Sequence, residues 1–279
     1  MPRTVHAIAL VALVIATIPG AAGAEGYFAG FAGAAFPADQ NVTLTPRFAQ
    51  SIRGIEPISV AIAREDIVLR DVNLTNAFLF GGKAGWFLDR DVLGGQFGLE
   101  AEMSRFRPEL QPMSAEFSGM AQVGREGIRF RTTAELEDQP LRIITLSGSL
   151  LYRRPFWKSP SLPHGRWQLY AGPGLAGVFA HLESNTLFIH EMRRVEDSDS
   201  ALAIQGIGGV KIFLTKHIAI FSEYKVLRSG DLEFHFEGMG SAIQSSSSSA
   251  FPPQAVPEEQ EQRFHLTVHQ VYGGVAIHF

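Results

Sequence analysis

Alternation of apolar and other residues with a period of two is the feature that most constrains the fold of this 279-residue chain. Eight segments keep this alternation for at least the roughly 9–11 residues that a tilted β-strand needs to cross a bilayer. Such segments predict an all-β protein whose strands each have one apolar and one polar face. They lie near residues 26–36, 73–88, 95–106, 141–154, 167–180, 200–214, 217–229 and 263–279.

Long and short connections alternate between these segments. The short ones are residues 89–91, the proline-rich stretch 155–166, and Thr215-Lys216. Long loops at one end and short turns at the other are typical of a bacterial outer-membrane barrel with both termini on the periplasmic side. We therefore expect an eight-stranded antiparallel transmembrane up-and-down β-barrel. Its long extracellular loops are expected near residues 37–72, 107–140, 181–199 and 230–262.

Periodicity alone does not separate such a barrel from a water-soluble β-sandwich, so other features decide between them. Glycine and alanine fill much of the presumed interior parity, which suits a narrow barrel lumen better than a packed sandwich core. Aromatic residues near strand ends are expected to form a girdle at the short-turn rim. These residues are Tyr27, Trp86, Tyr152, Trp167 and Phe279.

The first residues of the chain have the pattern of an export signal. Arg3 precedes an apolar stretch from Ala7 to Ile18, and Ala22-Gly23-Ala24 offers a small-x-small cleavage site. We expect a cleaved signal peptide at residues 1–24 and a mature barrel at residues 25–279. The absence of cysteine excludes disulfides, thiol nucleophiles and a cysteine-linked lipid anchor, and a net charge of -4 predicts no nucleic-acid partner.

Four stretches together resemble a known family, the small outer-membrane barrels of the OmpA and OmpX type, including opacity-like surface proteins. They are "GYFAGFAGAAF", "WQLYAGPGLAGVF", "GIGGVKIFLTKHIAIFSEYKVLRS" and the closing "VYGGVAIHF". The resemblance implies an eight-stranded outer-membrane barrel whose last strand is read by the outer-membrane assembly machinery. The expected assembly signal is the lipid-facing parity of that strand: Val271, Gly273, Val275, Ile277 and Phe279.

With the faces assigned, the lumen is expected to hold charges of both signs. Lys83 lies on the strand next to Glu100 and Glu102, while Lys211 and Glu223 are expected to face each other across the tight turn near residue 215. Paired charges are tolerable where isolated ones are costly, so we expect an ion-pair network that plugs the lumen. Its members are Lys83, Glu100, Glu102, Arg153, Lys211, Glu223 and Lys225.

Three functions follow from this arrangement. The first is a non-enzymatic protein with an occluded lumen and a structural and surface-interaction role, in which the long loops would bind a host or phage ligand. The second is a small-solute or ion channel that uses the same charges as a path. The third is a lipid A-modifying enzyme, yet none of the nine histidines has a serine two residues on, and His265 with Thr267 is the nearest approach. We predict neither enzyme activity, nor a cofactor, nor a metal site.

Two further expectations concern the end of the strands on the long-loop side. Arginines collect there, which predicts either long side chains that carry their charge to the interface or a collar that pairs with lipopolysaccharide phosphates, because guanidinium binds phosphate in a bidentate fashion; both can hold at once. In the last segment the apolar parity changes near His269-Gln270, which predicts either a β-bulge or the point where the strand leaves the membrane. The arginine collar comprises Arg70, Arg105, Arg107, Arg142 and Arg228.

Overall fold

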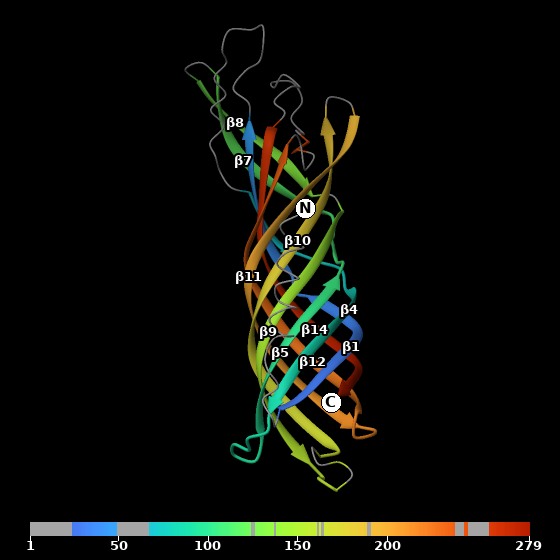
Figure 1. The fold of residues 1–279 in the computed structure, drawn as a ribbon. Helices are drawn as coiled ribbons and strands as arrows, with labels where there is room; N and C mark the ends of the chain where they lie inside the picture. Colours follow the sequence, from blue (N-terminus) through green and yellow to red (C-terminus); the bar gives the residue numbers. More distant parts are fainter. Residues whose placement is uncertain are drawn as a thin grey trace.

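The computed structural model shows one elongated, all-β molecule (Figure 1). The predicted signal peptide, residues 1–24, lies outside the described part of the chain except for Ala24. Among the described residues, no helix has the length and apolar character to cross a membrane. The structure describes residues 24–48, 67–123, 126–136, 138–160, 162, 165–188, 191–237, 243–244 and 257–279.

Eight antiparallel strands close into a ring, which confirms the predicted fold class. The last strand pairs with the first without interruption, from Tyr27 opposite His278 to Pro37 opposite Val268, so the ring has no free edge. In ring order the strands are β1 (Ala24–Pro37), β4 (Ala77–Leu88), β5 (Gln96–Phe106), β9 (Gln139–Phe156), β10 (Trp167–Phe188), β11 (Glu191–Phe213), β12 (Ile218–Glu237) and β14 (Pro257–His278).

Much of the sequence in the four long connections continues the barrel wall as β-structure. β10 and β11 pair residue by residue as far as Phe188 opposite Glu191. The 22 residues of β10 span roughly 70 Å at about 3.3 Å per residue, against roughly 30 Å of hydrocarbon. The other elements of this upper part are β2 (Gln40–Phe48), β3 (Ile67–Val72), β6 (Glu109–Leu110), β7 (Met113–Val123), β8 (Glu126–Leu136) and β13 (Ile243–Gln244).

β2, β3 and β6 pair within the sheet of the ring, whereas β7, β8 and β13 form a separate three-stranded sheet. β2 follows β1 along the same partner, β14, where Thr43 lies opposite Arg263. β3 pairs with β2 and leads into β4, and the β7–β8 hairpin caps the connection between β5 and β9. In Figure 1 this hairpin lies at the end of the molecule opposite the C-terminus. The molecule is therefore a barrel whose walls rise well beyond the length that a membrane requires.

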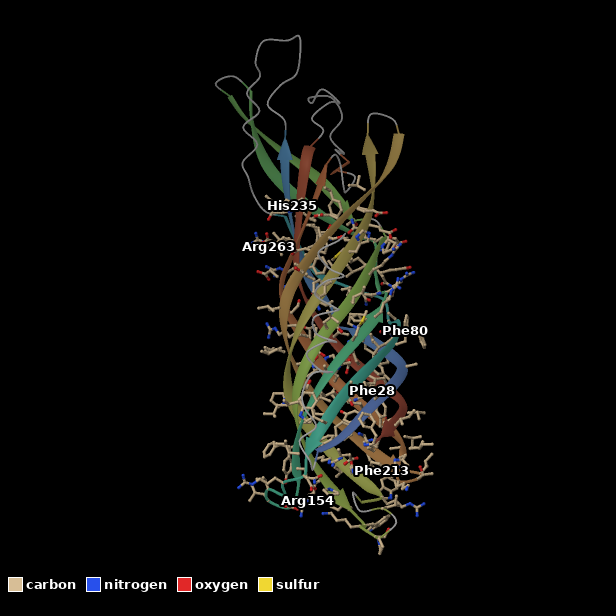
Figure 2. The ribbon with its side chains drawn as sticks, in the orientation of Figure 1. Phe28, Phe80, Arg154, Phe213, His235 and Arg263 are labelled. Atoms are coloured by element: carbon tan, nitrogen blue, oxygen red, sulfur yellow. The ribbon has the colours of Figure 1, made fainter. Side chains whose placement is uncertain are left out.

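The apolar side of the wall changes from the outside to the inside along the barrel. In the half near the short turns, large apolar side chains such as Phe28 and Phe80 are exposed on the outside (Figure 2). In the upper half, charged side chains such as Arg263 are exposed, and the interior is an apolar core. That core includes Leu141, Ile143, Val178, Leu182, Leu227, Leu232, Phe234, Phe236, Phe264, Leu266 and Val268.

This reversal explains the change of parity in β14 and corrects the predicted bulge. The ladder of β14 with β1 is continuous through His269-Gln270, and Phe264, Leu266 and Val268 are buried on the same parity as Gln270. Of the two alternatives predicted for this place, the β-bulge is therefore wrong, and the point where the strand leaves the membrane stays a prediction. The side chains keep their faces, while the apolar residues change from the outward face in the lower half to the inward face in the upper half. A register shift does occur on β12, between Arg228 and Asp231.

Candidate functional site

The lower half of the barrel encloses a charged interior that is the candidate functional site. Strand alternation directs the predicted lumen residues inward, and each is at most 5% exposed. β4 supplies Lys83, β5 supplies Glu100 and Glu102, and β9 supplies Arg153. The remaining members are Lys211 on β11 and Glu223 and Lys225 on β12.

The part of this charged interior that lies farther from the short turns joins strands that are not neighbours in the ring. Lys83 Nζ lies 3.0 Å from Glu100 on the adjacent strand and is also ion-paired with Glu223 across the lumen. Lys225 on β12 is ion-paired with Glu102 on β5. Two walls of the barrel are therefore tied together through buried charges.

Three tyrosine hydroxyls complete the coordination of these carboxylates. Tyr27 donates to Glu100, Tyr170 donates to Glu223 at 2.8 Å, and Tyr272 donates to Glu102 at 3.0 Å and also to Glu223. The expected place of Tyr27 in the aromatic rim is wrong, because its side chain points inward and is 2% exposed. Its parity, opposite to that of Phe28, is the sequence signal that identifies it as a lumen residue.

A second group of charges lies nearer the short turns. Arg153 is ion-paired with Glu25 and donates from Nε to Gln96 at 2.9 Å. His278 Nδ1 lies 2.6 Å from Glu25 Oε1, and its Nε2 lies 3.3 Å from Lys211 Nζ. Glu25 and His278 carry no role in the sequence-based prediction, although both lie on the inward parity of the first and last strands.

The expected contact between Lys211 and Glu223 does not form. The register of β11 with β12 places Lys211 opposite Phe221 and Glu223 opposite Gly209. Lys211 Nζ instead lies 4.0 Å from the centre of the Tyr27 ring, a cation–π contact. Among the described residues, no carboxylate lies within 4.0 Å of Lys211 Nζ.

The formal charges of the described lumen balance. Burying an ion costs several kcal/mol, which only partners and hydrogen bonds of good geometry offset. A balanced set of ion pairs and hydroxyl donors therefore suits a permanently filled interior. The carboxylates are Glu25, Glu100, Glu102 and Glu223, and the cations are Lys83, Arg153, Lys211 and Lys225.

Two groups of side chains in the described part of the chain have the ligand spacing of a metal site. Glu100, Glu102 and Glu223 form one, but lysine ammonium groups already pair with all three. The other lies on the outer face of β10 and β11 above the apolar belt and comprises His181, Glu183 and Glu196. There Glu183 is ion-paired with Arg142 at 2.5 Å.

The five arginines of the predicted collar do not form one group. Arg105 and Arg107 lie on or just beyond β5, and the pairing of Phe106 with Ile143 places Arg107 beside Arg142 of β9. By contrast, Arg228 lies on β12 and Arg70 on β3. The predicted assembly-signal residues Val271, Val275, Ile277 and Phe279 are exposed on the outside, and Gly273 shares their parity.

Comparison with known proteins gives structural likeness only. No protein-family model matches the chain, and no curated protein sequence matches it. The fold is an eight-stranded antiparallel β-barrel. Similar solved structures include the outer membrane protein OprG from Pseudomonas aeruginosa, with 11% identity and a TM-score of 0.43 over 92% of this chain and 96% of that one. The attachment invasion locus protein Ail of Yersinia pestis has 8% identity and a TM-score of 0.31 over 91% of this chain and 99% of that one. The outer membrane protease OmpT of Escherichia coli has 8% identity and a TM-score of 0.32 over 91% and 97%.

Proposed function

We propose that this protein is an exported outer-membrane barrel with an occluded lumen and a structural and surface-interaction role. The observation that carries the proposal is the balanced ion network inside the lower half. A permeating ion or solute would have to separate Lys83 from both Glu100 and Glu223, which leaves buried charges without partners. The network therefore fits a plug better than a small-solute or ion channel.

A second barrier lies above the network. There the interior changes to packed apolar side chains, where Phe234 stacks on Phe264 with ring centres 5.6 Å apart. An ion that passed the lower network would meet mostly apolar side chains, and the polar groups buried among them, Gln139, Ser184 and Gln262, already hydrogen-bond to one another. Two barriers of different chemistry in series support occlusion more strongly than either one alone.

The outside of the lower half supports a location within a membrane. Exposed apolar side chains cover it over all of its strands, an area much larger than the patches that soluble monomers leave exposed. Members of this belt include Phe28, Phe78, Leu99, Leu150, Leu169, Leu175, Leu202, Ile204, Ile220, Val271, Val275 and Ile277. In such a location the last strand, with Val271, Val275, Ile277 and Phe279 outward, would also meet the assembly machinery.

Conductance in planar bilayers tests the occluded lumen. The inserted protein should give no large and stable current steps, because its lumen is filled by the ion pairs and the apolar core. Heat-dependent mobility on gels should first show that the barrel is folded and inserted. Large, stable steps from a protein that shows this mobility shift would favour the channel instead.

One surface cluster favours a second candidate, a serine hydrolase. His181 lies between Ser198 Oγ, 2.7 Å from Nδ1, and the Glu196 carboxylate, 3.2 Å from Nε2. A nucleophile, a base and an orienting carboxylate in this order are the parts of a catalytic triad. The serine comes from the neighbouring strand, where it pairs directly with His181, so a search along one strand does not find it. The candidate ranks second because Ser198 and Glu196 lie on an open face rather than in a site that excludes water.

If this cluster is catalytic, ester hydrolysis or lipid A deacylation should fall roughly a thousandfold in a Ser198→Ala variant, because the nucleophile is lost. Lipid A mass spectra and a fluorogenic ester would report the change. Ser200→Ala, an exposed serine two residues along the same strand, is the matched control. Equal activity in both variants would remove the hydrolase from consideration.

A further inference from the structure

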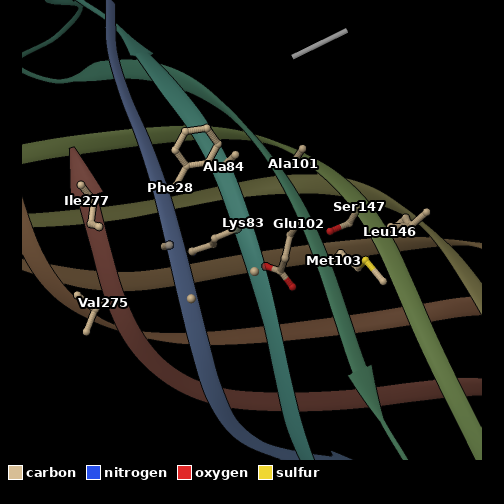
Figure 3. Close-up of a pocket in the computed structure, with 13 residues that line it drawn as sticks. Phe28, Lys83, Ala84, Ala101, Glu102, Met103, Leu146, Ser147, Val275 and Ile277 are labelled. Carbon is tan, nitrogen blue, oxygen red and sulfur yellow. The ribbon is translucent and has the colours of Figure 1, made fainter. Parts of the chain in front are cut away.

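A groove crosses the outside of the apolar belt over β14, β1, β4, β5 and β9 (Figure 3). Its volume of about 570 Å³ lies within the range of roughly 300–1,000 Å³ that is usual for ligand sites. Exposed side chains of Phe28, Met103, Val275 and Ile277 stand around it. The groove thus opens toward the outside of the belt, while Lys83 and Glu102, whose side chains belong to the charged lumen, also contribute to its lining.

Small residues form the floor of this groove, and the fold does not require them. A Cβ atom added to Gly30 would meet no atom within 4 Å, and one added to Gly82 would meet only the Ala29 carbonyl oxygen at 3.6 Å. Neither glycine has a positive φ. Larger residues would therefore fit at both positions, and their effect would be to fill the groove.

Two arginines, on and just beyond β5, lie past the groove, toward the long-loop end of that strand. The outward parity of β5 runs from Met103, which lines the groove, to Arg105 and then Arg107, at roughly 7 Å per step. Among the described residues, neither guanidinium has a carboxylate within 4.0 Å. Arg142 lies beside Arg107 but is ion-paired with Glu183, so Arg105 and Arg107 are the cations that an anion could meet at the upper edge of the belt. This grouping complements an anion, and guanidinium groups bind phosphate in particular.

We propose that the groove and the arginine pair Arg105 and Arg107 form a binding site for a phosphorylated lipid of the outer leaflet. One acyl chain fills the groove over Gly30 and Gly82, and the phosphate lies against the two guanidinium groups. The inference rests on the proposed outer-membrane location. It replaces the five-arginine collar with a single site on one wall, where the outward parity of β5 leads from the groove to both arginines.

Native mass spectrometry of the folded, full-length barrel in detergent tests the site. The probes are lipid A, phosphatidylglycerol and diacylglycerol, which carries acyl chains without phosphate. The wild-type barrel should retain one molecule of a phosphorylated lipid and release diacylglycerol. Preference for lipid A over phosphatidylglycerol would identify the glycolipid as the source of the phosphate, and the reverse preference would identify a phospholipid.

Two variants and their matched controls locate the site. Gly82→Leu should fill the groove, and Arg105→Gln with Arg107→Gln should remove the phosphate contacts, so each should weaken retention roughly tenfold or more. Gly208→Leu, an outward glycine on β11 with equal space, and Arg228→Gln on β12 should leave retention unchanged. Equal retention by all four variants, or equal retention of diacylglycerol, would overturn the site. A chain that fails to insert would instead contradict the outer-membrane location.

Discussion

Replacement of Lys83 by methionine should lower the free energy of unfolding by about 3–5 kcal/mol, because it leaves buried carboxylates without their cation. Lys83 is the only described residue that is ion-paired with both Glu100 and Glu223, and it joins opposite walls of the barrel. Methionine keeps a similar length and apolar stem, so the change removes the charge more than the volume. The loss should exceed that from any exposed lysine.

Urea unfolding in lipid vesicles, followed by tryptophan fluorescence, measures this effect. Lys216→Met, at the exposed turn between β11 and β12, is the control and should change stability by less than about 0.5 kcal/mol. Adding Glu223→Gln to Lys83→Met should restore part of the loss, because the charges again balance, and the double-mutant cycle gives the coupling. If Lys83→Met unfolds at the same urea concentration as Lys216→Met, the network does not stabilise the barrel.

A Phe264→Ala variant should lose about 3–5 kcal/mol as well, but for a different reason and in a different part of the barrel. Phe264 is 2% exposed and stacks on Phe234 in the apolar core above the charged lumen. Loss of the ring leaves a cavity in a section whose outside faces water, so this section should open locally before the lower half does.

Limited proteolysis of the inserted barrel separates this local opening from global unfolding. Phe264→Ala should be cut faster within the upper strands, while the heat-dependent gel shift of the lower half persists. Thr267→Ala, on the outward parity of the same strand, is the control and should be cut at the wild-type rate. An unchanged cleavage pattern in Phe264→Ala would show that the upper core does not hold these walls together.

The positions of the eight ring strands could be predicted from the sequence because alternation is a local property of each strand. The upper walls could not be predicted in the same way. A residue such as Leu266 or Phe234 faces inward where the inside is apolar, whereas Lys225 faces inward where the inside is charged. When only the alternation of residues is considered, a change in which face is apolar looks like an interruption of the strand. For this reason the change of apolar parity near His269 suggested a β-bulge.

The sequence predicted which residues line the candidate site better than it predicted which of them contact one another. Strand parity directs Lys83, Glu100 and Lys225 inward, and the structure agrees. Which cation meets which carboxylate depends on the registers of strands that are far apart in the ring, and no local pattern contains that information. A register of the β11–β12 turn that pairs Lys211 with Phe221 was enough to send Lys211 to the Tyr27 ring instead of Glu223.

The apolar side chains of the barrel wall face outward in the lower half and inward in the upper half. This change affects how deeply the barrel would lie in a membrane. Sinking the barrel by one outward step, roughly 7 Å along a strand, would draw Arg105 and Arg142 into hydrocarbon, and raising it would expose residues such as Leu99 to water. An arginine on the lipid face costs about 0–1 kcal/mol near the interface and about 2–4 kcal/mol at the midplane, so the cost rises with depth. In the proposed outer-membrane location, the point along each strand where the apolar face turns inward would therefore set how deep the barrel lies and how far its hairpins extend beyond the membrane.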